Sequence, residues 1–172
     1  MITEAWTLDN SQEVIRDNRV QIGRSLAAQW FDRGKAQAAL NLLDGLRALG
    51  GKYQNDVLKQ LATAYNNIAI MWMDRKHYPE ADQAFQSAGN IAYQVGDEDF
   101  YRGLRKNSSQ FLTQWGQEFY QQGKGETAKV KLFEALRHDE SNTVACRILS
   151  KIYFDAGDYR QAEYYLHWAL QH

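Results

Sequence analysis

The 172-residue sequence has one cysteine, one proline and no long apolar run. A single cysteine cannot form an internal disulfide, which favours a cytoplasmic protein or one indifferent to redox conditions. No stretch approaches the 18 apolar residues of a membrane span, and the first residues carry neither the basic region nor the apolar segment of a secretory signal. We therefore expect a cytoplasmic protein that does not insert into a membrane.

The sequence also lacks an excess of charge of either sign. Twenty lysines and arginines against 21 aspartates and glutamates leave a formal net charge of −1. Binding to nucleic acid depends on a strong positive field, so a nucleic-acid partner is not expected. The basic residues Arg102, Arg105 and Lys106 could contact a phosphate backbone, but a solvated helix face explains them at least as well.

Abundant alanine, leucine and glutamine favour helix, and apolar residues make up 44% of the chain, enough for a core. Strand signals are missing, because Val, Ile and Thr nowhere alternate with polar residues. A loosely ordered arm over residues 1–10 should precede the first helix, which Asp9-Asn10-Ser11 would cap. Apolar spacing and breaking residues predict eight helices, at about 11–33, 35–49, 55–75, 78–95, 98–122, 126–137, 143–156 and 159–172.

One pattern occurs four times, around Ala39, Ala81, Ala128 and Ala162, which are 42, 47 and 34 residues apart. An aromatic residue lies nine residues before each alanine (Trp30, Trp72, Phe119, Tyr153). A large apolar residue lies four after it (Leu43, Phe85, Leu132, Leu166), and Ala or Leu lies seven after it (Leu46, Ala88, Ala135, Ala169). Recurrence at such periods predicts stacked helical hairpins, none of which can bury its apolar face alone.

The pattern resembles the tetratricopeptide repeat (TPR), with units counted from Val20, Ala62, Ser109 and Thr143. The resemblance covers about residues 12–172 and implies an all-α, right-handed solenoid of four hairpins in a single domain, 11–172. Its units would be about 12–50, 53–96, 98–140 and 141–172. The usual proline at position 32 is missing, and two intervals carry 8 and 13 extra residues that look helical. The stretch 88–97 is also similar to the long repeats of kinesin light chains and bacterial peptide-sensing regulators.

In this family the first helix of each hairpin lines a concave groove that binds a peptide or protein. Family positions 5, 9, 12 and 13 correspond here to Ala28, Asp32, Asp74, Gln121, Asp155 and the candidate groove residues Arg24, Phe31, Asn66, Ile70, Met73, Thr113, Gln117, Tyr120, Arg147, Lys151 and Phe154. An apolar strip flanked by amide and charged groups suits an extended or helical peptide. The alternative is that the apolar residues at position 12 pack against the next hairpin. Arg24 with Ala28 does not match the family's carboxylate clamp, so recognition of a C-terminal carboxylate is not predicted.

The last predicted helix is rich in large apolar residues: Tyr159, Tyr164, Tyr165, Leu166, Trp168 and Leu170. Terminal repeats normally present a polar outer face. Three interpretations remain open: a homodimer formed through Tyr164, Tyr165 and Trp168, packing within the chain, or an edge left by truncation. A two-fold pairing would be the simplest closed assembly.

Signals for chemistry are weak. No histidine pairs with a second ligand at i+3 or i+4 in a metal-site arrangement, and Cys146 falls at a core position, where a structural thiol is expected. Gly123-Lys124-Gly125 lacks the spacing of a phosphate loop. We expect no catalytic residues, cofactor or metal, and a non-enzymatic protein-interaction module. The alternatives are a secretion or assembly chaperone, and a homo-oligomeric structural subunit that associates through its C-terminal helix.

Overall fold

The structure is a computed structural model that describes residues 2–49 and 51–171, with side chains described for 12–31, 33–49 and 51–171. The described residues contain helices and no strand. The helices are α1 (Ile2–Asp32), α2 (Ala36–Arg47), α3 (Gln54–Asp74), α4 (Tyr78–Val95), α5 (Glu98–Gln121), α6 (Gly125–His138), α7 (Thr143–Asp155) and α8 (Tyr159–Gln171). The predicted all-α fold class is confirmed for the part of the chain that the structure describes.

Seven of these helices lie where the sequence predicts them, but the predicted start of the first helix is wrong. Helix α1 begins at Ile2, so residues 2–10 are helical and not a loosely ordered arm. Asp9, Asn10 and Ser11 lie inside the helix, because residues that favour an N-cap are also tolerated in a helix interior. Neither glycine nor proline precedes Gly23, so nothing in the sequence breaks the helix earlier.

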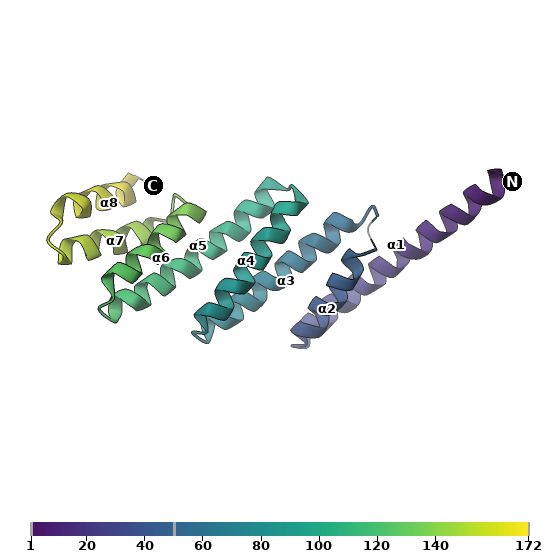
Figure 1. The fold of residues 1–172 in the computed structure, drawn as a ribbon, viewed down its shortest axis with the longest axis horizontal. Helices are drawn as coiled ribbons and strands as arrows, with labels where there is room; N and C mark the ends of the chain where they lie inside the picture. The colour runs from purple at the N-terminus through teal and green to yellow at the C-terminus, as the bar shows by residue number, and fades with distance from the viewer. Residues whose placement is uncertain (1, 50, 172) are drawn as a thin grey trace. The chain divides into compact units, whose positions relative to one another are not determined.

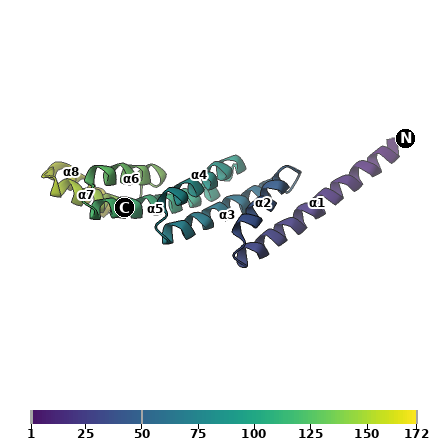
Figure 2. The same cartoon turned by 60° about the horizontal axis from the view of Figure 1, so that its bottom comes forward.

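Each even-numbered helix returns antiparallel beside the helix before it, which gives four hairpins (Figures 1 and 2). The chain divides into two compact units. Unit 1 comprises Met1–Trp72 with Pro79–Tyr101, and unit 2 comprises Met73–Tyr78 with Arg102–His172. The single domain and the handedness inferred from the sequence stay predictions.

Small residues occupy the contacts between the paired helices. The four alanines that mark the repeat, Ala39, Ala81, Ala128 and Ala162, are all buried. Gly116 on α5 shows why small size is needed, because a Cβ atom there would lie 2.9 Å from Cγ of Leu132 on α6. Such close approach lets large side chains fill the space beside the contact.

The turns inside the hairpins share one backbone conformation. Gly34, Gly123 and Gly157 have φ angles of 73°, 76° and 79°, and Lys76 occupies the same repeat position with φ 60°. Glycine adopts this left-handed region freely, whereas a side chain makes it costly. At Lys76 an ion pair with Glu118 accompanies the strained conformation, with 2.6 Å between Nζ and Oε1.

Asn142 positions α7 against α5 in unit 2. Its Oδ1 accepts a hydrogen bond from the Ala145 backbone N–H at 3.0 Å and so caps α7. Its Nδ2 donates to Oγ of Ser109 at 2.7 Å and to Oγ1 of Thr113 at 2.9 Å. Asn142 therefore both caps α7 and holds it to the neighbouring hairpin.

Candidate partner-binding grooves

The first helices of unit 1 enclose a depression, the α1–α3 groove, with a volume of about 420 Å³. Its apolar surface comes mainly from alanines and Phe31, and polar side chains from α3 form the opposite wall. The lining residues are Arg24, Ala27, Ala28, Phe31, Leu43, Asp56, Lys59, Gln60, Thr63, Ala64 and Asn67. The arrangement combines an apolar patch with polar groups that could fix the register of a ligand.

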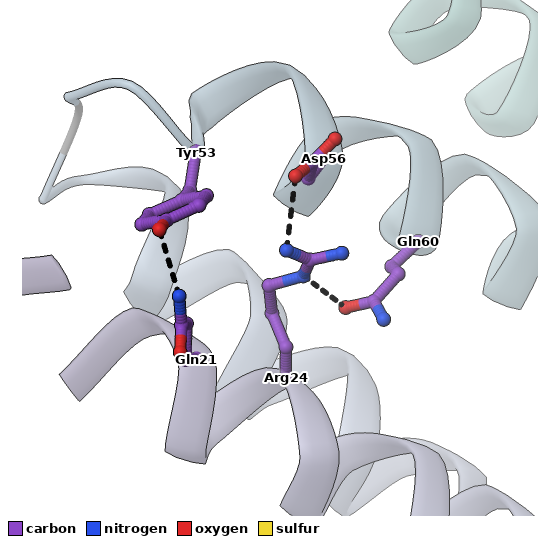
Figure 3. Close-up of polar contacts among 5 residues, drawn as sticks. All are labelled: Gln21, Arg24, Tyr53, Asp56 and Gln60. Atoms are coloured by element: carbon purple, nitrogen blue, oxygen red, sulfur yellow. Dashed lines mark hydrogen bonds and ion pairs between the residues drawn. The ribbon is translucent and has the colours of Figure 1, made fainter. Parts of the chain in front are cut away.

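Arg24 is already engaged with other residues that line this groove (Figure 3). Arg24 donates from Nη1 to Oδ2 of Asp56 at 3.0 Å and from Nε to Oε1 of Gln60 at 3.1 Å. Nearby, Nε2 of Gln21 donates to the Tyr53 hydroxyl at 2.7 Å. Since Arg24 is paired with a carboxylate, the α1–α3 groove does not offer a free positive charge at this side chain.

Unit 2 has a corresponding depression, the α5–α7 groove, made of two hollows of about 360 and 540 Å³. Gln117 and Val144 line both hollows, so the two adjoin. The other lining residues are Lys106, Gln110, Thr113, Gln114, Tyr120, Gln121, Asp139, Ser141, Asn142, Thr143, Arg147, Ile148 and Lys151.

Amide and cationic side chains face each other across this groove. Gln110, Gln114, Gln117 and Gln121 are exposed and follow one another along α5 at intervals of four, three and four residues, which places them on one helix face. On α7, Arg147 and Lys151 are exposed one turn apart. Glutamine amides both donate and accept hydrogen bonds, so such a row matches the backbone of an extended peptide.

Tyr120 connects the two helices of the α5–α7 groove. Its hydroxyl donates to Oδ2 of Asp155, and Nζ of Lys151 lies 5.5 Å from the centre of its ring. The hydrogen bond to Asp155, helped by desolvation and by the aspartate's charge, raises the pKa of Tyr120 to about 12. Tyr120 is therefore a neutral donor at physiological pH, and its ring supports the Lys151 ammonium.

The structure brings six of the predicted groove residues to the two grooves with accessible side chains. Arg24 and Phe31 line the α1–α3 groove, as does Ala28, and Gln117, Tyr120, Arg147 and Lys151 line the α5–α7 groove. Thr113 borders the second groove but is buried, with its hydroxyl donating to the Ser109 carbonyl at 2.8 Å. Its side chain is structural.

The remaining predicted groove residues are elsewhere. Asn66 is buried, and Ile70 and Met73 are half-buried and line neither groove. Phe154 is exposed and makes an edge contact with Tyr159, with 5.5 Å between ring centres. Of the position-13 residues, Gln121 lines the α5–α7 groove and Asp155 holds Tyr120, while Asp32 lies outside the described side chains.

The sequence analysis missed groove residues that precede the repeat motif on the long helices. Asp56, Lys59 and Gln60 come from the first turns of α3, before the unit counted from Ala62. Similarly, Lys106 belongs to the extended start of α5. The sequence signal that could have indicated these groove residues is the extra helical length in the two long repeat intervals, because that length extends the surface that a ligand can contact.

The aromatic residues predicted for self-association divide into two groups. Tyr165 stacks on Tyr153 with 5.7 Å between ring centres, and Nε1 of Trp168 donates to the Glu140 carbonyl at 3.2 Å. Both side chains thus have packing partners within the chain. Tyr164 is exposed, and its ring lies 5.1 Å from that of Tyr165 and 6.4 Å from that of Trp168.

The described residues hold no group of three or more His, Cys, Asp or Glu side chains arranged to hold a metal ion. Cys146 is buried, and desolvation raises the pKa of its thiol, which disfavours the reactive thiolate. Among the described helices, none combines the length and apolar character needed to cross a membrane.

No protein-family model and no curated protein matches the chain. Solved structures of TPR-like helical proteins do match at low identity. BtubC from P. vanneervenii is 16% identical with a TM-score of 0.43, and the match covers 91% of this chain and 63% of that one. This chain therefore spans less than two thirds of BtubC.

Two further solved structures are similar over most of both chains. PilF of Pseudomonas aeruginosa is 17% identical with a TM-score of 0.44, covering 91% of this chain and 77% of that one. MamA is 15% identical with a TM-score of 0.41, covering 94% and 82%. At these identities the likenesses concern the fold alone.

Proposed function

We propose that this chain is a non-enzymatic interaction module that binds a peptide or protein partner in its α1–α3 and α5–α7 grooves. The observation that carries the proposal is the convergence of accessible, chemically suitable side chains from separate helices on each groove. Gln117 and Tyr120 come from α5, and Arg147 and Lys151 come from α7, yet all four line one hollow.

The α5–α7 groove supports the proposal through its hydrogen-bonding capacity. Amide side chains can satisfy the N–H and C=O groups of an extended peptide, and the two cations can pair with acidic side chains. Within the described residues Arg147 has no ion-pair partner, so its guanidinium is available to a ligand. An extended peptide with acidic residues fits this groove best.

The α1–α3 groove supports the proposal through apolar contact. Ala28 is exposed on its floor, and Phe31 is half-buried at its side. Because Arg24 is paired with Asp56, binding here would depend on apolar anchors more than on charge. The two grooves thus offer different chemistry to a partner.

A peptide array tests the α5–α7 groove. Binding of the wild-type protein to immobilised peptides of graded acidic content is compared with that of Arg147→Glu and of Arg160→Glu, a matched charge reversal on α8 outside the groove. Arg147→Glu should weaken binding by about tenfold or more, while Arg160→Glu should bind as the wild type does. Equal binding by Arg147→Glu and wild type would refute the use of this groove.

A second pair of variants tests the α1–α3 groove. Ala28→Arg fills the groove floor, whereas Ser25→Arg adds the same side chain to an exposed position of α1 that lines no groove described here. Reduced binding by Ala28→Arg alone is the expected result. Identical binding by both variants would remove this groove from the proposal.

A further inference from the structure

In α3 and α5 the repeat includes a set of three residues that is buried in the interior of the chain. Counted in the same register, this set is Val57, Leu61 and Ala64 in α3, and Leu104, Ser108 and Phe111 in α5, and every member is at most 8% exposed. In α1 the corresponding residues are Ile15, Arg19 and Ile22, here called the α1 outer face. Ile15 is 67% and Ile22 69% exposed.

The α1 outer face continues onto α2. Ile15 and Ile22 border a hollow of about 660 Å³ that Leu42 and Leu49 of α2 also line. Ridges of one helix pack into such hollows at every helix contact of this kind. The first hairpin therefore presents large aliphatic side chains at positions that later hairpins bury.

The last hairpin leaves exposed a helix position that the earlier hairpins bury. Tyr159, Glu163, Leu166 and Leu170 form a stripe along α8, here called the α8 outer face. Leu166 is 49% exposed, whereas its repeat equivalents Leu43, Phe85 and Leu132 are 2%, 4% and 0% exposed, and Leu170 is 77% exposed. In the first three hairpins this position is covered, and in the fourth it is open.

The two outer faces match in spacing and in charge. Each has an apolar residue, then a charged residue four positions on, then an apolar residue three positions further: Ile15, Arg19, Ile22 and Tyr159, Glu163, Leu166. The charged residue is positive on α1 and negative on α8. Neither Arg19 nor Glu163 forms an ion pair with any described residue.

We propose that the α1 outer face of one copy docks on the α8 outer face of a second copy, extending the repeat from chain to chain. Two different faces meet, so the contact is heterologous and can add further copies in the same direction. It differs from a two-fold dimer, in which one face pairs with itself. Residues of the two proposed partner grooves take no part in it.

Sedimentation velocity over a range of concentrations tests the proposal. The wild-type chain should form species that grow with concentration. Ile22→Glu and Leu170→Glu each place a carboxylate in one of the two faces, and each alone should weaken self-association about 100-fold. Both side chains are exposed, so neither substitution disturbs the core.

Mixing the two variants distinguishes head-to-tail docking from two-fold pairing. Ile22→Glu keeps an intact α8 outer face and Leu170→Glu keeps an intact α1 outer face, so the mixture should form a one-to-one dimer that grows no further. Recovery on mixing also shows that both variants are folded. Failure to recover association would overturn the proposal.

A charge exchange and a control complete the experiment. Arg19→Glu and Glu163→Arg should each reduce association, and the double variant R19E/E163R should regain it. Tyr164→Glu, on another face of α8, should associate as the wild type does. A wild-type chain that stays monomeric, or an Ile22→Glu variant that associates normally while Tyr164→Glu does not, would overturn head-to-tail docking.

Discussion

At the residue scale, the packing of the two helices in each hairpin depends on pairs of facing residues. In each pair, the size of one side chain limits the size of the other. The first unit shows this at Gly23 and Leu46, where a Cβ atom on Gly23 would lie 2.7 Å from Cδ1 of Leu46. The TPR pattern has a bulky residue at the position of Gly23 and alanine at that of Leu46. In this unit the small residue, Gly23, lies on α1 and the large residue, Leu46, lies on α2. The large side chain of Leu46 therefore fills the space that the missing side chain of Gly23 leaves between the two helices.

Gly116 provides the clearest test of this size constraint. A Cβ atom there would contact Leu132 at 2.9 Å and the Ala128 carbonyl oxygen at 3.2 Å, and backbone cannot move aside as a side chain tip can. Overpacking costs about 1–3 kcal/mol, while alanine gains about 1 kcal/mol of helix propensity. Gly116→Ala should therefore lower the free energy of unfolding by about 1 kcal/mol in urea denaturation.

Gly103 on the same helix is the matched control. A Cβ atom there would meet nothing within 4 Å, so only the propensity term acts. Gly103→Ala should raise the free energy of unfolding by about 0.5–1 kcal/mol. If both variants were stabilised alike, the close contact between α5 and α6 would be wrong.

Tyr120 gives a pH-dependent prediction. Its pKa in the folded chain, about 12, lies above the ordinary value of 10.0 because of the hydrogen bond to Asp155. The stabilisation from this bond is fully present below about pH 10 and is lost as the pH rises towards 12. In ultraviolet titration, Asp155→Ala should shift one tyrosine to a lower pKa. Unchanged titration curves would contradict the Tyr120–Asp155 contact.

At the element scale, the sequence predicted most helix ends because glycine turns and apolar spacing are strong local signals. The turn glycines Gly34, Gly123 and Gly157 end three of the first helices with positive φ angles. The start of α1 could not be found this way, because capping residues do not exclude helix before them. The burial of Asn66 and Thr113 could not be predicted from the sequence either, because it depends on which face of their helix the neighbouring helices cover.

Asn142 should contribute more to stability than an ordinary N-cap. It caps α7 and also donates to Ser109 and Thr113 of α5, whereas Asp158 accepts only from the Gln161 backbone N–H at 3.1 Å to cap α8. Thermal unfolding should show Asn142→Ala destabilised by about 2 kcal/mol and Asp158→Ala by about 1 kcal/mol.

The aspartate variant separates the two roles of Asn142. Asn142→Asp keeps an acceptor for the Ala145 N–H but loses the donor that reaches α5. It should be less stable than the wild type, because the hydroxyls of Ser109 and Thr113 already donate to backbone carbonyls. Stability equal to that of the wild type would show that only the cap matters.

At the scale of the whole molecule, the sequence predicted what kind of site to expect, a groove lined by the first helices, but it did not predict every residue that lines the groove. The TPR resemblance predicted Gln117, Arg147 and Lys151 as groove residues, and all three line the α5–α7 groove. It could not identify Asp56 or Gln60, since these belong to helical turns that the 34-residue pattern lacks. The extended first helices thus enlarge both grooves beyond the family pattern.

The central claim is that the first helices of the hairpins, α1, α3, α5 and α7, hold the partner. Amide hydrogen exchange of the free protein and of its complex with a peptide selected on the array measures this directly. The account predicts slower exchange in those four helices, concentrated at residues 24–31 and 110–121 and in α7. Slower exchange confined to α2, α4, α6 and α8 would contradict it.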